Sequence, residues 1–541
     1  MSKQKFKQIT KDEVNFNMVK DYVEVQGHSI TEAVKRLCSY KGIEYSDNLR
    51  RRFSERLAKK GVTEKTSDKY VPLELSDEYQ IAVKRTVPKS KYYLISSCQA
   101  ESELHKDFFD NMRAFSEYIG AEILLQPSRY RNPSSLEANR RIKEKEKGRT
   151  IWAKEAQPYL YASDLKLNNF LSVLMALKIQ PTAKLPLSST NGFTGDSSAI
   201  IPHCKQHLES MPVLPDTPHK LLLTTGSVTK PNFTDTKIGY ESAWAHEYGF
   251  VLAEIVDDEK YFVHQVSADK DGNFYFLDYK VFNGVVSKGA EPYPAIVFGD
   301  LHFGETCEIA YQASLEMSRR LKVENVFTHD VGNLHSISHH DLKSPTTMLK
   351  KEEEGLTDLQ GEIEMILDEM SRLSNYLPMS QIHVVESNHP LWIERWIDSN
   401  DWRKSPNKRM YLELAVLVAS GKTKGKGVLN YLIEQEVPSV KTYTEDDSLR
   451  VKGFEMLLHG HRGNASSRGS VNQFKGLSFK SISAHSHVPR KINGSLSAGT
   501  LTKLKPDYVK GLSAWMNSNV VITPNGRASH IHILGGSYTT L

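Results

Sequence analysis

The chain has 541 residues, with 70 Lys and Arg against 65 Asp and Glu, which gives a formal net charge of +5. At about 100–200 residues per domain, this length allows roughly three or four domains. The hydrophobic fraction is 39%, and no apolar run approaches the roughly 18 residues of a membrane helix, so we expect no membrane association. The amino terminus has no apolar stretch behind its basic residues, which argues against a secretory signal. The four cysteines form no CxxC pair, which argues against disulfides and cysteine-based zinc and favours a reducing cytoplasm.

Residues 1–70 are predicted to form a small basic helical domain, with 16 Lys and Arg against 10 Asp and Glu. Apolar residues at helical spacing indicate one helix from about residue 30, and Leu49, Phe53 and Leu57 indicate a second. Two short helices around a glycine turn, the second very basic, are typical of a helix-turn-helix DNA-binding domain. The predicted DNA contacts are Arg50, Arg51, Arg52 and Arg56. The alternative is a helical bundle whose arginines only face water.

Residues 75–290 are predicted to form an α/β region of unknown role. Apolar patterns indicate a strand at 92–95, a helix to about residue 118 and a strand at 121–125. No internal repeat or low-complexity tract is evident, and no residue in this region points to a particular chemistry. The region could be an oligomerisation platform or a DNA clamp, and the sequence does not choose between them.

Residues 291–541 contain the candidate site, because five predicted strands in this range each end in Asp, Asn or His. The strand at 295–298 is followed by Asp300 and His302, at the edge of a sheet where α/β folds bind ligands. The other four strands are followed by Asp330, by Asn388 and His389, by His459 and His461, and by His485 and His487. A single histidine at a strand end is more often a core or surface residue, but five such sets in order indicate a site.

The chemistry of these side chains suits divalent metal ions. Imidazole, carboxylate and amide groups without thiolate favour borderline or hard ions such as Mn²⁺, Fe²⁺ or Zn²⁺. Seven such ligands would be too many for one ion and would fit two ions that share a carboxylate. Two ions about 3.5–4 Å apart can clamp the attacking and leaving oxygens of a phosphoryl centre and lower the pKa of a bridging water.

In this order, the motifs resemble the signature of the calcineurin-like metallophosphoesterases: D-x-H, G-D-x-x-D, G-N-H-[DE], a strand-end His and G-H-x-H. The resemblance implies an α/β fold, a four-layer sandwich of two mixed sheets flanked by helices, for residues 291–541, beside the helical domain and the middle α/β region. It implies that Asp330 bridges two ions, one also bound by Asp300, His302 and His487, the other by Asn388, His459 and His485. It further implies that His389 is catalytic, stabilising the transition state and protonating the leaving oxygen.

Several positions depart from the family pattern. His329 replaces the glycine of the second motif, and Asn333 stands where many members have a second aspartate. Pro390 replaces the acidic residue that follows the catalytic histidine. Because that acid often orients the imidazole, the sequence leaves the partner of His389 open.

Basic residues around the site favour a polyanionic substrate. Residues 450–510 contain 11 Lys and Arg against two acids, and the loop 421–427 is rich in Gly and Lys. Each phosphate contact would add salt-dependent affinity without sequence information. The candidate substrate-binding residues are Asn333, His335, His461, Arg462, Arg468, Lys422 and Lys424. The alternative is that these cations balance the acidic stretch 351–371 and keep the protein soluble.

Within the family, the layout resembles the Mre-type and SbcD-type DNA-repair nucleases, and the whole chain resembles the pre-early DNases of T5-like bacteriophages, which are associated with breakdown of host DNA. These resemblances imply a DNase with two divalent ions, Mn²⁺ first and Fe²⁺, Zn²⁺ or Mg²⁺ as alternatives, acting in the infected bacterial cytoplasm as a homo-oligomer. Two other functions stay open. One is a phosphatase or small-molecule phosphodiesterase, and the other is a DNA-binding host-takeover protein with a decayed phosphoesterase site.

Overall fold

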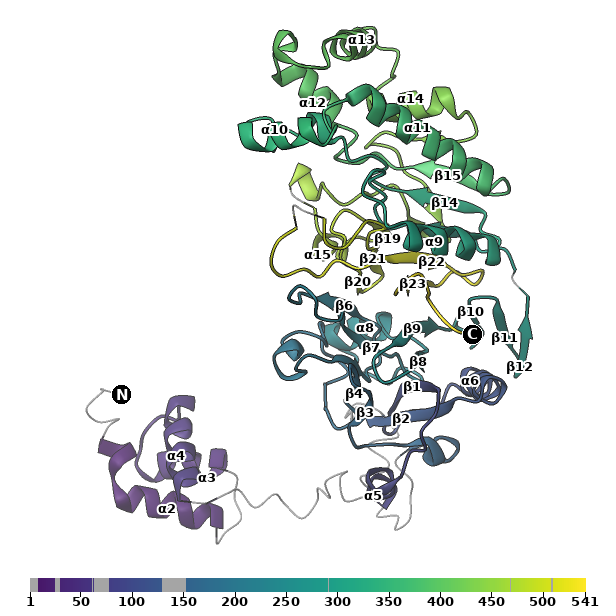
Figure 1. Ribbon diagram of the computed structural model, residues 1–541. Helices are drawn as coiled ribbons and strands as arrows, with labels where there is room; N and C mark the ends of the chain where they lie inside the picture. The colour runs from purple at the N-terminus through teal and green to yellow at the C-terminus, as the bar shows by residue number, and fades with distance from the viewer. Residues whose placement is uncertain are drawn as a thin grey trace. The chain divides into compact units, whose positions relative to one another are not determined.

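The computed structural model of the chain (Figure 1) describes residues 8–24, 30–60, 62, 77–128, 152–289, 291–467, 469–506 and 509–541. The chain divides into two compact units, Met1–Gln80 and Ile81–Leu541. Among the described residues, no helix combines the length and the apolar character needed to span a bilayer.

The described residues of the first unit include the helices α2 (Glu13–Glu24), α3 (Ile30–Tyr40) and α4 (Asp47–Lys59). The Ser46 side chain caps α4 by accepting a hydrogen bond from the backbone N–H of Leu49. The apolar faces of the three helices meet in one core that includes Phe16, Val19, Val34, Leu37, Leu49, Phe53 and Leu57. The two helices expected from the sequence are therefore present as α3 and α4, preceded by α2.

The arginines of α4 are not equivalent. Three of them have side chains that remain 42–64% exposed and pair with acids of the same helix: Arg50, Arg51 and Arg52. Arg56 instead pairs with Glu13 of α2 at 2.7 Å, donates to the carbonyl oxygen of Thr10 at 2.7 Å, and lies 4.3 Å from the centre of the Phe16 ring. Arg56 therefore attaches α4 to α2, while DNA contact by the other three arginines stays a prediction.

The second unit contains four sheets in its described residues. A ten-stranded sheet has the order β17 (Arg450–Val451), β18 (Phe454–Glu455), β19 (Lys480–Ser483), β21 (Ser495–Ser497), β20 (Arg490–Ile492), β6 (Leu208–Met211), β7 (Lys220–Thr224), β5 (Ser198–Ile201), β4 (Leu171–Val173) and β3 (Leu165–Asn168). A six-stranded sheet has the order β16 (Lys441–Thr442), β15 (Gln381–Val384), β14 (Asn325–Thr328), β13 (Ala295–Val297), β22 (Ser518–Ile522) and β23 (Ala528–His532).

The two smaller sheets belong to the earlier part of this unit. A four-stranded sheet has the order β2 (Glu122–Ser128), β1 (Tyr92–Gln99), β8 (Gly249–Ile255) and β9 (Tyr261–Ser267), and a three-stranded sheet joins β10 (Phe274–Phe276), β11 (Tyr279–Phe282) and β12 (Val285–Lys288). The α-helices are α5 (Asp77–Lys84), α6 (Lys106–Ile119), α8 (Lys237–Trp244), α9 (Glu308–Arg320), α10 (Pro345–Glu353), α11 (Leu359–Tyr376), α12 (Trp392–Ser399), α13 (Lys408–Ala419), α14 (Val428–Glu436) and α15 (Val471–Phe474). Mixed sheets with helices between their strands confirm the predicted α/β class.

Each half of the ten-stranded sheet packs against a sheet of its own. In one half, β5 and β7 share a buried core with the four-stranded sheet, including Ile95, Leu124, Ile200, Leu223 and Val251. In the other half, β18, β19 and β21 share a core with the six-stranded sheet, including Val297, Phe327, Ile482, Leu496 and Val520. The strands that form the second core include β13, β14, β18 and β19, whose ends carry the predicted site.

The ten-stranded sheet crosses residue 290, where the sequence suggests a domain boundary. Its two halves meet where β20 pairs antiparallel with β6. The proposed ranges 1–70, 75–290 and 291–541 stay a prediction, and the structure adds that strands on both sides of residue 290 share one sheet.

Candidate metal centre

The predicted ligands follow the ends of neighbouring parallel strands. Strands β13, β14 and β15 run parallel in one sheet, and β18 and β19 run parallel in the other. Asp300 and His302 follow β13, Asp330 follows β14, Asn388 follows β15, His459 follows β18, and His485 and His487 follow β19. Because parallel strands end at the same sheet edge, this arrangement gathers the side chains at one place.

Six of the seven predicted ligands form overlapping groups whose ligand atoms lie within 4.8 Å of one another. The groups are Asp300 with His302 and His487, His302 with Asp330 and His389, and Asp330 with His459 and His485. The seventh, Asn388, joins them through its Oδ1, which lies 2.8 Å from Nε2 of His459. The predicted set is thus brought together, and its His and Asp members could hold a metal ion.

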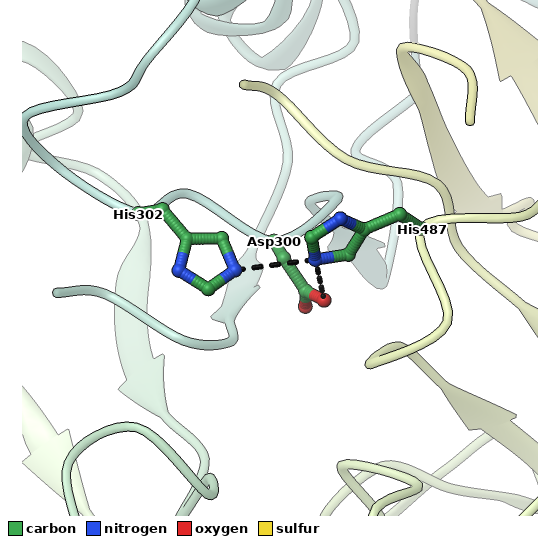
Figure 2. A group of neighbouring side chains, drawn as sticks. All are labelled: Asp300, His302 and His487. Carbon is green, nitrogen blue, oxygen red and sulfur yellow. Dashed lines mark hydrogen bonds and ion pairs between the residues drawn. The ribbon is translucent and has the colours of Figure 1, made fainter. Parts of the chain in front are cut away.

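Figure 2 shows the first group, in which the His487 imidazole contacts both the His302 imidazole and the Asp300 carboxylate. Nε2 of His487 lies 3.0 Å from Oδ2 of Asp300 and 3.2 Å from Nε2 of His302. The Asp300 side chain is fully buried, and within the described structure its Oδ1 accepts no hydrogen bond. A buried carboxylate oxygen without a donor is costly, and a cation placed among these three side chains would satisfy it.

Asp330 occupies the position between the two ends of the cluster. Its Oδ2 lies 3.2 Å from Nε2 of His459 and 3.8 Å from Nε2 of His302. The ring of His485 lies 5.0 Å from the ring of His459, centre to centre. One carboxylate thus lies within 4 Å of an imidazole from each of the two predicted ligand sets.

Several ligands adopt a backbone conformation that side chains other than glycine rarely take. His302, Asp330, His485 and His487 have φ values of 42°, 42°, 68° and 58°. Each such residue costs of order 1 kcal/mol, and strain of this kind concentrates at functional sites. The strained residues are four of the seven predicted ligands.

The pKa values of three ligands suit metal binding, whereas at His459 burial alone would lower the pKa but the charge of Asp330 raises it. Burial lowers the pKa of His302 well below its usual range and lowers that of His485 to about 4. Burial alone would raise the pKa of Asp300, but the hydrogen bond and charge of His487 lower it to about 2. At neutral pH these imidazoles are neutral and Asp300 is ionised, which are the forms that ligate metals.

The structure gives His389 the partner that the sequence leaves open. Its Nδ1–H donates to the carbonyl oxygen of Asn333 at 3.1 Å, and its ring stacks on Trp392 with 4.0 Å between ring centres. Its backbone N–H donates to Oδ1 of Asp330 at 3.2 Å. A backbone carbonyl therefore orients the imidazole in place of the acid that Pro390 replaces.

A cavity of about 400 Å³ opens at the cluster. Two predicted substrate-binding residues, Asn333 and His335, line it together with five of the seven metal-ligand candidates, Trp392 and Trp515. His461 and Arg462 instead pair with Glu445, at 2.8 Å and 2.6 Å. Lys422 and Lys424 are exposed in the loop before α14, and Arg468 lies outside the described residues.

Three features of the centre do not follow from the sequence motifs. Trp392 and Trp515 pack on the rings of His389 and His487, with 4.0 Å and 4.1 Å between ring centres. The buried His329 places its Nδ1 3.4 Å from Nδ1 of His459. The position of Trp392, three residues after His389, is a sequence signal that could have been noticed, whereas nothing local points to Trp515.

The chain is 26% identical over 483 residues to Protein A1 of Escherichia phage T5, a match that covers 84% of this chain and 83% of that protein. No protein-family model matches the chain. No solved structure matches it.

Proposed function

We propose that the chain is a two-metal phosphodiesterase that cleaves DNA. The observation that carries this proposal is the convergence of seven nitrogen and oxygen ligands, from five strand ends, on one buried cluster with Asp330 at its centre. The same order of ligands motivates the metallophosphoesterase assignment, with the six-stranded sheet and half of the ten-stranded sheet as the central layers of the sandwich.

Two divalent ions, when bound, would supply Lewis-acid activation of water and charge stabilisation at phosphorus. Asp300, His302, Asp330 and His487 would hold one ion, and Asp330, Asn388, His459 and His485 the other. We propose Mn²⁺ first, as the family resemblance implies, with Fe²⁺, Zn²⁺ and Mg²⁺ as alternatives; a ligand set without thiolate suits all four.

His389 would act as the acid. The hydrogen bond to Asn333 and the Trp392 ring fix its plane, which leaves Nε2 as the atom that can give a proton to the leaving oxygen. Burial lowers the pKa of His389, so the free ring is a readily dissociating acid. The negative charge of a bound phosphodiester would favour the protonated ring before the leaving group departs.

Exposed basic residues in both units support a nucleic acid as the substrate. Arg50, Arg51 and Arg52 on α4 and Lys422 and Lys424 keep accessible cationic groups that can contact phosphates. The similarity to a phage protein supports a phage origin, and therefore action on host DNA in the cytoplasm of an infected bacterium. A homo-oligomer is part of the proposal and is testable by sedimentation.

Incubation of the purified protein with plasmid DNA, with Mn²⁺ and with EDTA, tests the proposal. Cleavage that requires Mn²⁺ and stops with EDTA is the expected result. Hydrolysis of p-nitrophenyl phosphate without DNA cleavage would instead support a phosphatase or small-molecule phosphodiesterase. Salt-sensitive DNA binding without cleavage of either substrate would support a DNA-binding protein with a decayed site.

A further inference from the structure

The strand order of residues 92–267 repeats that of residues 295–532. In both ranges a strand is followed by a helix and a parallel partner: β1, α6 and β2 in the first, β13, α9 and β14 in the second. The first strand then pairs antiparallel with a late strand, β8 or β22, which pairs antiparallel with the next, β9 or β23.

The second sheet repeats in the same way. Read from its two edges inward, the ten-stranded sheet has the orders β3-β4-β5-β7-β6 and β17-β18-β19-β21-β20. The strand directions agree at every step: antiparallel, parallel, parallel, antiparallel. All nine described strands of the first half and its helix α6 therefore have a counterpart in the second half, which indicates a repeated fold.

Equivalent residues lie at equivalent ladder positions. Ile200 pairs with Leu223, as Ile482 pairs with Leu496, and all four lie in the two cores. Three residues after each leucine a short motif begins, Gly-Ser-Val-Thr-Lys at 226–230 and Gly-Thr-Leu-Thr-Lys at 499–503. In both motifs the first hydroxyl lies 2.9 Å from the hydroxyl of the following threonine.

The two halves meet about a local pseudo-two-fold axis. Leu208 and Lys491 are equivalent, because they pair with Leu223 and Leu496 respectively, and they also pair with each other across the β6–β20 joint. Glu209 and Arg490 form an ion pair of 2.7 Å at the same joint. Figure 1 shows β6 and β20 beside each other.

The first half lacks the side chains of the metal centre. Ser97 corresponds to Asp300, since Ser97 bridges to Ser227 of the first motif as Asp300 bridges to Thr500 of the second. Counting two residues on puts Gln99 at the position of His302. Leu124 and Phe327 match by their core positions and by their pairing with Ile95 and Val297, with one residue more between Val297 and Asp300 than between Ile95 and Ser97, and this match puts Pro127 at the position of Asp330. The matched isoleucines put His203 and Lys205 at the positions of His485 and His487.

The first half lacks the positive φ values as well as the metal ligands. The counterparts of the four strained ligands, Gln99, Pro127, His203 and Lys205, are all described, and none has a positive φ. Proline cannot adopt a positive φ at all, so Pro127 removes both the bridging carboxylate and its conformation. Within the described residues, the four-stranded sheet also has no equivalent of β15, the strand that precedes Asn388 and His389.

We infer that residues 92–267 are a second copy of the fold in residues 295–532, that the chain is an internal pseudo-dimer joined at β6 and β20, and that the second copy has lost its metal centre. One chain therefore supplies both halves of a two-fold arrangement but only one metal-binding half. The loss of metal binding in one copy rests on the proposed function, whereas the duplication rests on topology and register.

Two matched pairs of variants test the loss of metal binding in the full chain. His203→Gln and His485→Gln change equivalent buried positions, and Ser97→Ala and Asp300→Ala provide a second pair if one variant fails to fold. Bound Mn²⁺ is measured by equilibrium dialysis. We expect the affinity to fall at least about tenfold in His485→Gln and Asp300→Ala, and to be unchanged in His203→Gln and Ser97→Ala. Loss of Mn²⁺ in the first-half variants would overturn the inference, whereas unchanged binding in all four would overturn the proposed function.

The joint has its own test, which does not depend on metal. Glu209→Cys combined with Arg490→Cys places two thiols at paired ladder positions, within reach of a disulfide. We expect an intrachain cross-link on oxidation, seen as a mobility shift that reductant reverses and that neither single variant shows. Absence of the cross-link in the folded double variant would overturn the pseudo-dimer.

Discussion

Residues 92–267 and 295–532 have the same strand order but different strand ends. Both keep a buried sandwich core, with Ile200 and Leu223 in one and Ile482 and Leu496 in the other. The second has buried carboxylates and positive φ values at its strand ends, whereas the first has Ser97 and Pro127 at matching positions. The strained and charged strand ends are therefore not needed to build the fold, because both halves have the buried apolar core and only one has those strand ends.

We expect the largest loss of DNA cleavage from a change of Asp330, the central ligand of the second half. Asp330→Ala removes the carboxylate that both ion positions share, so we expect DNA cleavage to fall to background, a loss of about 10⁴-fold or more. The measurement is the rate of plasmid cleavage at saturating Mn²⁺.

Pro127→Ala is the matched control, at the equivalent strand end of the first half. It should keep the full cleavage rate, because Pro127 offers no ligand atom. Substantial activity in Asp330→Ala, with Mn²⁺ still bound, would show that this carboxylate does not bridge the ions.

The sequence predicts the second half better than the first for a physical reason. Asp300 and His302 directly follow an apolar strand, so a local pattern suffices to place them at a sheet edge. The partner of His389 is a backbone carbonyl of Asn333, and Trp515 arrives from 126 residues further on, so both depend on tertiary packing. The duplication leaves only the short motif at 226–230 and 499–503 in the sequence, because core positions accept many apolar residues.

The next effect separates metal binding from catalysis. His389→Gln should lower the cleavage rate by about 10²–10³-fold, the range expected for losing a general acid. Mn²⁺ affinity should stay near the wild-type value, because all seven proposed metal ligands are unchanged in this variant. Single-turnover cleavage and equilibrium dialysis measure the two quantities, and a fully active His389→Gln would exclude the proposed acid.

A smaller effect concerns stability. An ion bound beside the buried Asp300 would compensate a charge that the fold otherwise leaves poorly matched. Mn²⁺ at about 100 times its Kd should therefore raise the free energy of unfolding by about 2.7 kcal/mol for each site that it occupies, as linkage requires. Urea unfolding with Mn²⁺ and with EDTA measures it. Asp300→Asn should lose most of this gain, and Gln99→Ala, at the position of His302 in the first half, should keep it.

The smallest effect lies in the first half and depends on pH. Burial lowers the pKa of His203 to about 3. Its neutral ring has both nitrogens engaged, Nε2–H with the carbonyl of Gln180 at 3.1 Å and Nδ1 with the N–H of Lys205 at 3.1 Å. As pH falls below about 6.5, the unfolded chain takes up a proton that the folded chain refuses. His203 should therefore cost about 2 kcal/mol of stability between pH 8 and pH 5.

His203→Gln should remove that part of the pH dependence, measured by urea unfolding at pH 8 and pH 5. The difference between the variant and the wild type should be the same with Mn²⁺ and with EDTA, because no ion competes with the proton for this ring. At His485, where an ion would bind the neutral ring, Mn²⁺ should oppose protonation and extend stability to lower pH. A change in the contribution of His203 on adding Mn²⁺ would show that the first half also binds the ion, which would contradict the proposed difference between the two halves.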